Sequence, residues 1–205
     1  MQEQAVINIL QEQLKFTDQS IDKLKMFETE LLKVNRKHNF IAKSTEGFIW
    51  NRHILDSAQL VKYIDFNKNK GSLSDLGSGA GFPGLVLAIY NQNFNFHVKL
   101  YEKSPVKREF LHEMLVKLKI KASLFLNVFD ERIESEYIIS RAFKKLNKII
   151  QVSREIAKKP HKLLILKGQN AQEEAIKAFK SYKYSYKLEK SMTDEKSKIL
   201  IADIF

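Results

Sequence analysis

The chain has 205 residues, enough for one α/β domain with a helical extension but short for two domains that each bury a large core. Neither a run of about 18 uncharged apolar residues nor the basic start and apolar core of a secretory signal occurs, so we expect a cytoplasmic protein without a membrane span. The absence of cysteine excludes disulfides and cysteine nucleophiles, and the five scattered histidines predict no metal site.

The net charge of +11 favours a polyanionic partner such as nucleic acid. The charge is unevenly distributed, because residues 31–43 contain four basic side chains and no acidic one. These four are Lys33, Arg36, Lys37 and Lys43. We predict that they contact RNA phosphates, and the alternative is a solvated helix end and loop.

The residue pattern of positions 1–64 predicts helices. We expect this segment to form a helical extension that packs on the core, and we expect the main α/β domain to span residues 65–205. Thr17 can cap a helix whose apolar residues recur about every 3.6 positions. His53 and Asp56 are three apart on one face of a later helical segment. We expect them to form a pair that anchors the extension on the sheet, and direct contact with RNA is the alternative.

After residue 71 short apolar or β-branched runs alternate with longer amphipathic ones, which predicts βαβ units and a parallel sheet with helices on both faces. Strands are expected at 72–76, 96–101, 123–127, 137–140 and 162–166, and helices at 83–90, 105–118, 144–157 and 171–179. Two further strand-like runs, at 184–188 and 199–205, have no helix between them and predict a hairpin. A mostly parallel, seven-stranded α/β sheet with an antiparallel C-terminal hairpin is typical of Rossmann-like class I methyltransferases.

A glycine cluster follows the first predicted strand. Four of the seven glycines fall in the segment Asp75-Leu76-Gly77-Ser78-Gly79-Ala80-Gly81-Phe82-Pro83-Gly84. As D-x-G-x-G-x-G, this segment is typical of the loop that binds S-adenosylmethionine, where absent side chains let the backbone approach the ligand. Read from Gly79 as G-x-G-x-x-G, it matches the dinucleotide fingerprint, whose helix N-terminus binds pyrophosphate.

The methyl-donor register is favoured because the predicted strand ends at Leu76, so the dinucleotide register would begin late in the turn. An NAD(P)-dependent oxidoreductase is the alternative, and the predicted C-terminal hairpin and the lack of a second substrate domain argue against it. The loop residues expected to hold the cofactor are Asp75, Gly77, Ser78, Gly79 and Gly81.

Acidic residues follow the next two predicted strands. Glu102 ends the second strand, where a carboxylate can hold a ribose diol with two hydrogen bonds, and the alternative is a solvated strand-end acid. The segment Glu131-Arg132-Ile133-Glu134 follows the third strand, where a loop would lie beside the adenine. Glu102 therefore supports nucleoside binding without choosing between the two cofactors.

Several motifs, taken in order, point to one family. Asn39-Phe40-Ile41 looks like an Asn-Leu-Thr/Ile element, and the segment from Trp50 to Ser57 resembles W-x-x-H-I-L-D-S. The glycine loop is similar to D-L-G-S-G-A-G-F-P-G, and Ser140-Arg141-Ala142-Phe143 and Lys167-Gly168 correspond to S-R-A-F and K-G. Over most of its length the chain resembles the bacterial small-subunit ribosomal RNA guanine-N7 methyltransferases, the RsmG or GidB family.

The resemblance implies an S-adenosylmethionine-dependent enzyme that methylates N7 of a guanine in 16S ribosomal RNA, guanosine 527 of the decoding-region loop. The substrate would be the RNA itself or a precursor of the small subunit, and we expect the enzyme to be a monomer. The resemblance also implies ligand contacts at Gly77 and Phe82, at Ile133 and Glu134 near the adenine, and at Arg141.

Arg141, at the end of the fourth predicted strand, is the expected catalytic residue. Guanine N7 carries a lone pair and no proton, so attack on a sulfonium methyl group needs no general base and depends on orientation. N7 must stay free, so a donor to the neighbouring O6 is the sensible contact. The alternatives are that Arg141 holds the cofactor or forms a structural bridge to Asp75 or Glu102.

The RNA itself sets further expectations. Because the major groove of A-form RNA is too narrow for side chains, the target guanine should lie in a loop or otherwise be exposed. Lys167 ends the fifth predicted strand and is expected to face a substrate phosphate, unless it is simply solvated. Phe82 or Phe143 could stack on the extruded base, and both fit a role as core aromatics equally well.

Overall fold

The computed structural model describes residues 1–129, 133–141, 145–157, 159–180, 182 and 184–205. Its chain begins with two helices, α1 (Glu3–Glu12) and α2 (Asp18–His38). Thr17 caps α2 as predicted, because its Oγ1 accepts a hydrogen bond from the Ser20 N–H at 3.1 Å. The helix ends at Asn39, whose left-handed conformation (φ 47°) turns the chain away.

The next helical segment is irregular. It consists of a 3₁₀ helix η1 (Lys43–Phe48), a π-helical turn η2 (Trp50–Leu55), a short α3 (Asp56–Ala58) and a second 3₁₀ helix η3 (Gln59–Tyr63). A π-helical turn is wider than an α-helical one and is common at functional sites. Here the segment presents the side chains of His53 and Asp56 and the main-chain carbonyl of Arg52 to the end of the sheet.

A seven-stranded sheet forms the centre of the molecule, with strand order β3-β2-β1-β4-β5-β7-β6. Strand β7 runs antiparallel to both β5 and β6, and the pairs among the first five strands are parallel. The predicted fold class is therefore confirmed. The strands are β1 (Ser72–Leu76), β2 (His97–Tyr101), β3 (Ala122–Phe125), β4 (Tyr137–Ser140), β5 (His161–Lys167), β6 (Tyr186–Lys190) and β7 (Lys198–Ile204).

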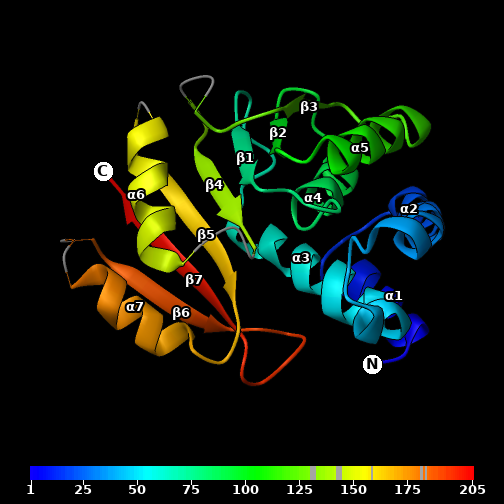
Figure 1. Ribbon diagram of the computed structural model, residues 1–205, viewed down its shortest axis with the longest axis horizontal. Coiled ribbons are helices and arrows are strands. Elements are labelled where there is room, and N and C mark those ends of the chain that lie inside the picture. Colours follow the sequence, from blue (N-terminus) through cyan, green and yellow to red (C-terminus); the bar gives the residue numbers. More distant parts are fainter. Residues whose placement is uncertain (130–132, 142–144, 158, 181, 183) are drawn as a thin grey trace.

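Helices cover both faces of the sheet. On one face lie α4 (Gly84–Tyr90) and α5 (Pro105–Lys117), and on the other lie α6 (Leu146–Ile156) and α7 (Ala171–Phe179), as Figure 1 shows. Side chains alternate between two hydrophobic clusters along a strand: in β5, Leu164 belongs to the first and Leu163 to the second. This alternation is why the central strands β4 and β5 carry apolar residues at successive positions, Ile138 and Ile139 in β4 and Leu163 to Leu166 in β5.

The helical extension shares the first of these clusters with α4, α5 and the sheet. Phe27 of α2 is fully buried, with its ring centroid 5.3 Å from that of Phe82 and 6.2 Å from that of Phe110. The extension thus packs directly beside the glycine loop, and the division of the chain at residue 64 stays a prediction. None of the described helices is both long enough and apolar enough to cross a membrane.

Candidate cofactor cleft and adjoining pocket

The glycine loop turns sharply where β1 ends. Gly77 and Ser78 both donate their N–H groups to the Tyr101 carbonyl oxygen at 2.9 Å, which holds the loop against the end of β2. Gly79 has φ +58°, and a Cβ added there would meet nothing nearer than the Gly77 oxygen at 3.9 Å. The backbone at Gly79 is therefore bare and open on its outer side, as a loop that contacts a ligand through main-chain atoms requires.

Asp75 supports the loop from below. Its side chain is fully buried, and Oδ2 accepts a hydrogen bond from the Gly84 N–H at 2.9 Å. A Cβ on Gly84 would lie 2.4 Å from that oxygen, so only glycine permits this approach. Burial raises the pKa of Asp75 to about 7, and Oδ1 has no hydrogen-bond partner among the described residues. Asp75 thus ties β1 to α4 and does not line the cleft above it.

A cleft of about 420 Å³ opens over the loop, and we call it the glycine-loop cleft. Glu102 lies at its edge, with Oε2 accepting from the Gly79 N–H and Oε1 from the Ser104 N–H, both at 2.8 Å. The residues that line it are Phe40, Ile41, His53, Gly77, Ser78, Gly79, Ala80, Phe82, Tyr101, Glu102, Lys103, Lys107, Leu126, Val128 and Arg141. Six of the predicted cofactor residues are thus brought together here.

The other predicted cofactor residues lie elsewhere. Gly81 is buried beneath the loop, where a Cβ would lie about 3 Å from Leu85 and Phe27. Ile133 is fully buried in the second hydrophobic cluster, and Glu134 is exposed; neither lines the cleft. Glu131 and Arg132, also part of the predicted adenine loop, fall outside the described residues.

Sequence reasoning missed the residues that close the cleft on the β3 side. Leu126 and Val128 follow β3 directly and line the cleft where the acidic segment 131–134 had been expected. Their position just after a strand end was the available signal, because parallel strands carry ligand sites at their carboxyl ends. Lys103 and Lys107, near the start of α5, also line the cleft and add positive charge to it.

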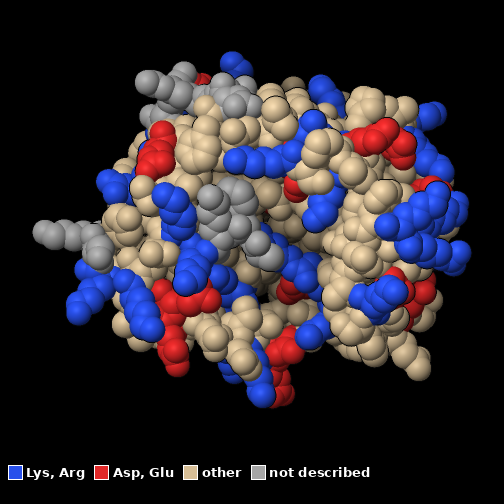
Figure 2. Space-filling view, in the orientation of Figure 1, with Lys and Arg blue, Asp and Glu red and all other residues tan. Residues whose placement is uncertain are grey.

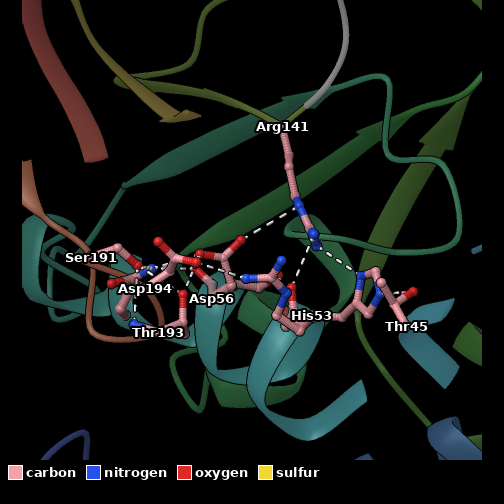
Figure 3. Close-up of polar contacts among 10 residues, drawn as sticks. Thr45, His53, Asp56, Arg141, Ser191, Thr193 and Asp194 are labelled. Atoms are coloured by element: carbon pink, nitrogen blue, oxygen red, sulfur yellow. Dashed lines mark hydrogen bonds and ion pairs between the residues drawn. The ribbon is translucent and has the colours of Figure 1, made fainter. Parts of the chain in front are cut away.

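Arg141 follows β4 and contacts the helical extension (Figure 3). Its Nη1 lies 3.0 Å from His53 Nδ1, and its Nη2 donates to the Arg52 carbonyl oxygen at 3.0 Å. Its Nε is 3.5 Å from Asp56 Oδ2. The alternative, a structural bridge from Arg141 to Asp75 or Glu102, is absent from the described contacts, and His53 and Asp56 each contact Arg141 instead of pairing with one another. The anchor between extension and sheet therefore runs through Arg141.

His53 is neutral in this network. Burial, together with the positive charges of Arg141 and Arg52, lowers its pKa from 6.5 to about 4. Because Arg141 can only donate, Nδ1 must accept, so the ring proton is on Nε2 and is donated to Thr45 Oγ1 at 2.9 Å. The imidazole ring also lies 5.0 Å from the Phe82 ring. Phe82 is thus a buried wall residue packed between His53 and the core, and Phe143 lies outside the described residues.

A second hollow of about 510 Å³, the outer pocket, lies on the other side of Arg141. Figure 2 shows this face hollowed near its centre, with Lys, Arg, Asp and Glu atoms around the opening. Arg141 lines both hollows. The other charged side chains of the outer pocket are the cations Arg52, Lys167 and Lys196 and the carboxylates Asp56, Glu174 and Asp194.

The loop between β6 and β7 closes the outer pocket. Its Thr193 donates through Oγ1 to Asp56 Oδ1 at 3.2 Å, and its Asp194 pairs with Arg52 at 3.0 Å. Lys167 does face the pocket, as expected of a residue at the end of β5, and its Nζ pairs with Glu174 at 2.6 Å. The pocket thus joins the extension, β4, β5 and the C-terminal hairpin.

The four basic residues predicted to contact RNA are exposed, on α2 and at the start of η1. Figure 2 shows Lys and Arg side chains gathered over α2 at the right edge of the molecule. Lys33 pairs with Glu30 at 2.9 Å, and Glu30 also pairs with Lys117 at 2.8 Å. Part of the charge of Lys33 is therefore compensated, whereas no ion pair involves Arg36, Lys37 or Lys43 in the described part of the chain.

Comparison with known proteins supports the same reading. A family model described as rRNA small subunit methyltransferase G matches residues 20–201. The Ribosomal RNA small subunit methyltransferase G of Rickettsia felis is 38% identical over 182 residues, 88% of this chain and 91% of that protein. Its counterpart from Pelagibacter ubique is 33% identical over 181 residues, 85% of this chain and 84% of that protein.

Among solved structures, a SAM-dependent methyltransferase from Aquifex aeolicus is similar in fold, with a TM-score of 0.58 and 15% identity, covering 87% of this chain and 98% of that one. The predicted methyltransferase activity with S-adenosylmethionine as methyl donor is confirmed, and the oxidoreductase alternative is not supported. With a family model spanning most of its length and relatives above 30% identity, the chain belongs to the rRNA small subunit methyltransferase G family.

Proposed function

We propose that this protein transfers a methyl group from S-adenosylmethionine to N7 of one guanine in 16S ribosomal RNA, acting in the cytoplasm as a monomer. The observation that carries the proposal is the position of Arg141, whose side chain lines the glycine-loop cleft on one side and the outer pocket on the other. A methyl donor in the first and a base in the second would meet at this arginine.

The residues of the glycine-loop cleft fit the cofactor. Its volume of about 420 Å³ lies within the range of small-molecule sites, roughly 300–1,000 Å³. Gly79 leaves the backbone bare, and Glu102 stands where a ribose diol is held. Although both Glu102 oxygens accept a main-chain N–H, a carboxylate has about four acceptor sites, so two ribose hydroxyls still find partners.

The proposed cofactor contacts are therefore Gly77, Ser78, Gly79, Phe82, Glu102 and Arg141, with Asp75 and Gly81 supporting the loop from below. Leu126 and Val128 take the place proposed for Ile133 and Glu134 beside the adenine, because they line the cleft. When bound there, the cofactor supplies an electrophilic methyl group on a sulfonium.

In this mechanism the main task of the protein is to orient the guanine base relative to the methyl group. N7 has no proton to lose, so the reaction needs no general base, and neutral His53 already accepts a hydrogen bond from Arg141. Three of the five Arg141 N–H groups have described partners, which leaves two to donate to guanine O6. Holding the reacting atoms in line contributes roughly 7–11 kcal/mol.

RNA binding is assigned to two surfaces. We infer that four exposed residues contact phosphates without reading sequence, namely Lys33, Arg36, Lys37 and Lys43. We infer that Lys167, in the outer pocket, meets the phosphate of the extruded nucleotide. The support is the exposure of the first set and the presence of Lys167 in the same pocket as Arg141.

The test is to map methylation directly. Small-subunit RNA and small subunits from cells lacking the corresponding gene would be incubated with the protein and labelled S-adenosylmethionine, then cleaved chemically at N7-methylguanosine. A single cleavage site that depends on the protein is the expected result, and the two substrates show whether RNA or a subunit is preferred. Label in another base, or in protein, would overturn the proposal.

A further inference from the structure

Asp56 and Arg141 stand side by side in the outer pocket, and we propose that together they select guanine as the target base. In this arrangement Asp56 accepts the N1–H and the N2 amino group of the base while Arg141 donates to O6. The inference rests on the proposed function, because it takes N7 of guanine as the methyl acceptor. It assigns a specificity-determining role to an acidic residue of the helical extension.

The order of features across the site matches the order of atoms along the base. Glycine-loop residues line only the cleft, Arg141 lines both hollows, and Asp56 lines only the outer pocket. Along the edge of guanine, N7 comes first, O6 second, and N1–H with the N2 amino group last. A base with N7 toward the cleft and O6 at Arg141 therefore turns its two donors toward Asp56.

Adenine fails at both positions. Its N6 amino group, a donor, would meet the guanidinium of Arg141, which can only donate. Its N1, an acceptor, would meet the carboxylate of Asp56, which can only accept when ionised. A site built to pair with polar groups of one ligand rejects a ligand that leaves those groups unpaired, so the pair discriminates between the two purines.

Asp56 is held so that one oxygen faces the pocket. Oδ1 accepts hydrogen bonds from Gln59 Nε2 at 2.9 Å and from Thr193 Oγ1 at 3.2 Å. Oδ2 has only the longer 3.5 Å contact with Arg141 Nε among the described residues. The side chain is 15% exposed, which fits a group that is positioned by the protein but still reachable by a ligand.

The other two carboxylates of the outer pocket are engaged differently. Asp194 pairs with Arg52 and accepts from the Lys196 N–H at 2.8 Å, and Glu174 pairs with Lys167. Neither makes a hydrogen bond or ion pair with Arg141 in the described part of the chain. Asp194 is therefore a matched control, because it is a carboxylate in the same pocket that does not contact Arg141, the residue proposed to donate to O6.

The experiment compares guanosine with inosine at the target position of otherwise identical RNA. Inosine keeps N7, O6 and N1–H but lacks the N2 amino group, so it removes one of the two hydrogen bonds assigned to Asp56. Single-turnover methylation is measured for wild type, Asp56→Asn and Asp194→Asn. Gln59 and Thr193 would keep the asparagine oxygen at the Oδ1 position, so the amide NH₂ would replace Oδ2 and donate where an acceptor is needed.

Wild type and Asp194→Asn should methylate guanosine about 10-fold faster than inosine, on the scale of one hydrogen bond to a base. In Asp56→Asn the two rates should become equal, and the rate on guanosine should fall by about 10-fold or more. A general displacement of Arg141 would slow both substrates alike and leave their ratio unchanged, so the ratio reports on base reading alone. Adenosylhomocysteine affinity and the melting temperature should stay near wild type.

Two results would overturn the inference. One is a wild-type enzyme that does not distinguish guanosine from inosine, a measurement that needs no variant to fold. The other is Asp56→Asn with the wild-type ratio. If wild type methylates neither RNA at N7, the proposed function itself fails, which is a different outcome from equal rates on both.

Discussion

The two hollows on either side of Arg141 are built in different ways. The glycine-loop cleft comes mainly from short stretches that follow strands β1, β2 and β3, at residues 77–82, 101–103 and 126–128. The outer pocket joins residues 45–56, 166–174 and 193–197, which lie far apart in the chain. The first is a property of the α/β core, whereas the second exists only because the extension and the hairpin loop meet.

The two hollows also differ in what holds their side chains. Glu102 at the cleft is fixed by main-chain N–H groups of its own neighbourhood, Gly79 and Ser104. Arg141 is fixed by His53, Asp56 and the Arg52 carbonyl, all from the extension. The helical extension is thus part of the candidate active site, and changes in the two hollows should separate cofactor binding from base positioning.

The largest effect is expected from Gly79→Val in the cleft. The branched side chain would occupy the space open to the ligand and would strain a backbone at φ +58°. Adenosylhomocysteine affinity, measured by calorimetry, should fall on the order of 100-fold or more, with a melting temperature lower by a few degrees at most. Gly47→Val is the control, because no atom lies within 4 Å of its added Cβ. Unchanged affinity in Gly79→Val would place the cofactor elsewhere.

An intermediate effect is expected from pH, through His53. Its pKa is about 4 when folded and 6.5 when free, so below pH 6.5 the unfolded chain binds a proton that the folded chain does not. Stability should therefore fall as the pH drops from 6.5 to 4, by roughly 3 kcal/mol from this residue.

Urea unfolding across that pH range checks this prediction. His53→Gln should show a shallower dependence than wild type, whereas His112→Gln, on the exposed face of α5, should match wild type. Equal slopes for wild type and His53→Gln would mean that the buried imidazole does not oppose protonation. Because a protonated His53 can no longer accept from Arg141, methylation should also fall at acid pH more than adenosylhomocysteine binding does.

The smallest effect per residue is expected outside both hollows. Replacing Lys33, Arg36, Lys37 and Lys43 by Gln should weaken RNA binding and flatten its salt dependence by up to about 0.7–0.9 log units per lost phosphate contact. Lys33 should contribute least, because Glu30 pairs with it. Cofactor affinity should not change.

The matched control for that surface replaces four exposed lysines on α6, α7 and β6, namely Lys148, Lys177, Lys187 and Lys190. Filter-binding titrations at several salt concentrations measure the slope for both variants. A slope that drops equally in the two variants would show that total charge, and not the surface near α2, drives RNA binding.

Much of the core could be predicted because its signals are local. Strands β1 and β4 match their predicted limits, Ser72–Leu76 and Tyr137–Ser140, since β1 ends where the glycine loop begins and β4 is a short apolar run that ends in a polar residue. The glycine loop was recognisable for the same reason. The turn needs a positive φ at Gly77, Gly79 and Gly81, and these glycines lie within five consecutive positions, so they are visible in the sequence.

The partners of Arg141 could not be predicted in the same way. His53 lies 88 positions earlier in the chain. The other acceptor is the main-chain carbonyl of Arg52, which cannot be identified from the pattern of side chains. The expected direct pair of His53 and Asp56 was wrong because the prediction treated the segment as isolated, whereas the partly buried guanidinium of Arg141 contacts both side chains. Packing of the extension on the sheet decides this contact.

The role of Arg141 is tested by Arg141→Lys, measured for adenosylhomocysteine affinity, single-turnover methylation and melting temperature on one preparation. Lysine keeps the positive charge but cannot contact His53, Asp56 and O6 with one planar group. If Arg141 orients the base, the affinity should stay within a few-fold of wild type and the methylation rate should fall on the order of 10²-fold, the scale of a small misplacement of reacting atoms. An affinity or melting temperature that falls in proportion to the rate, or a wild-type rate at saturating substrate, would contradict this role.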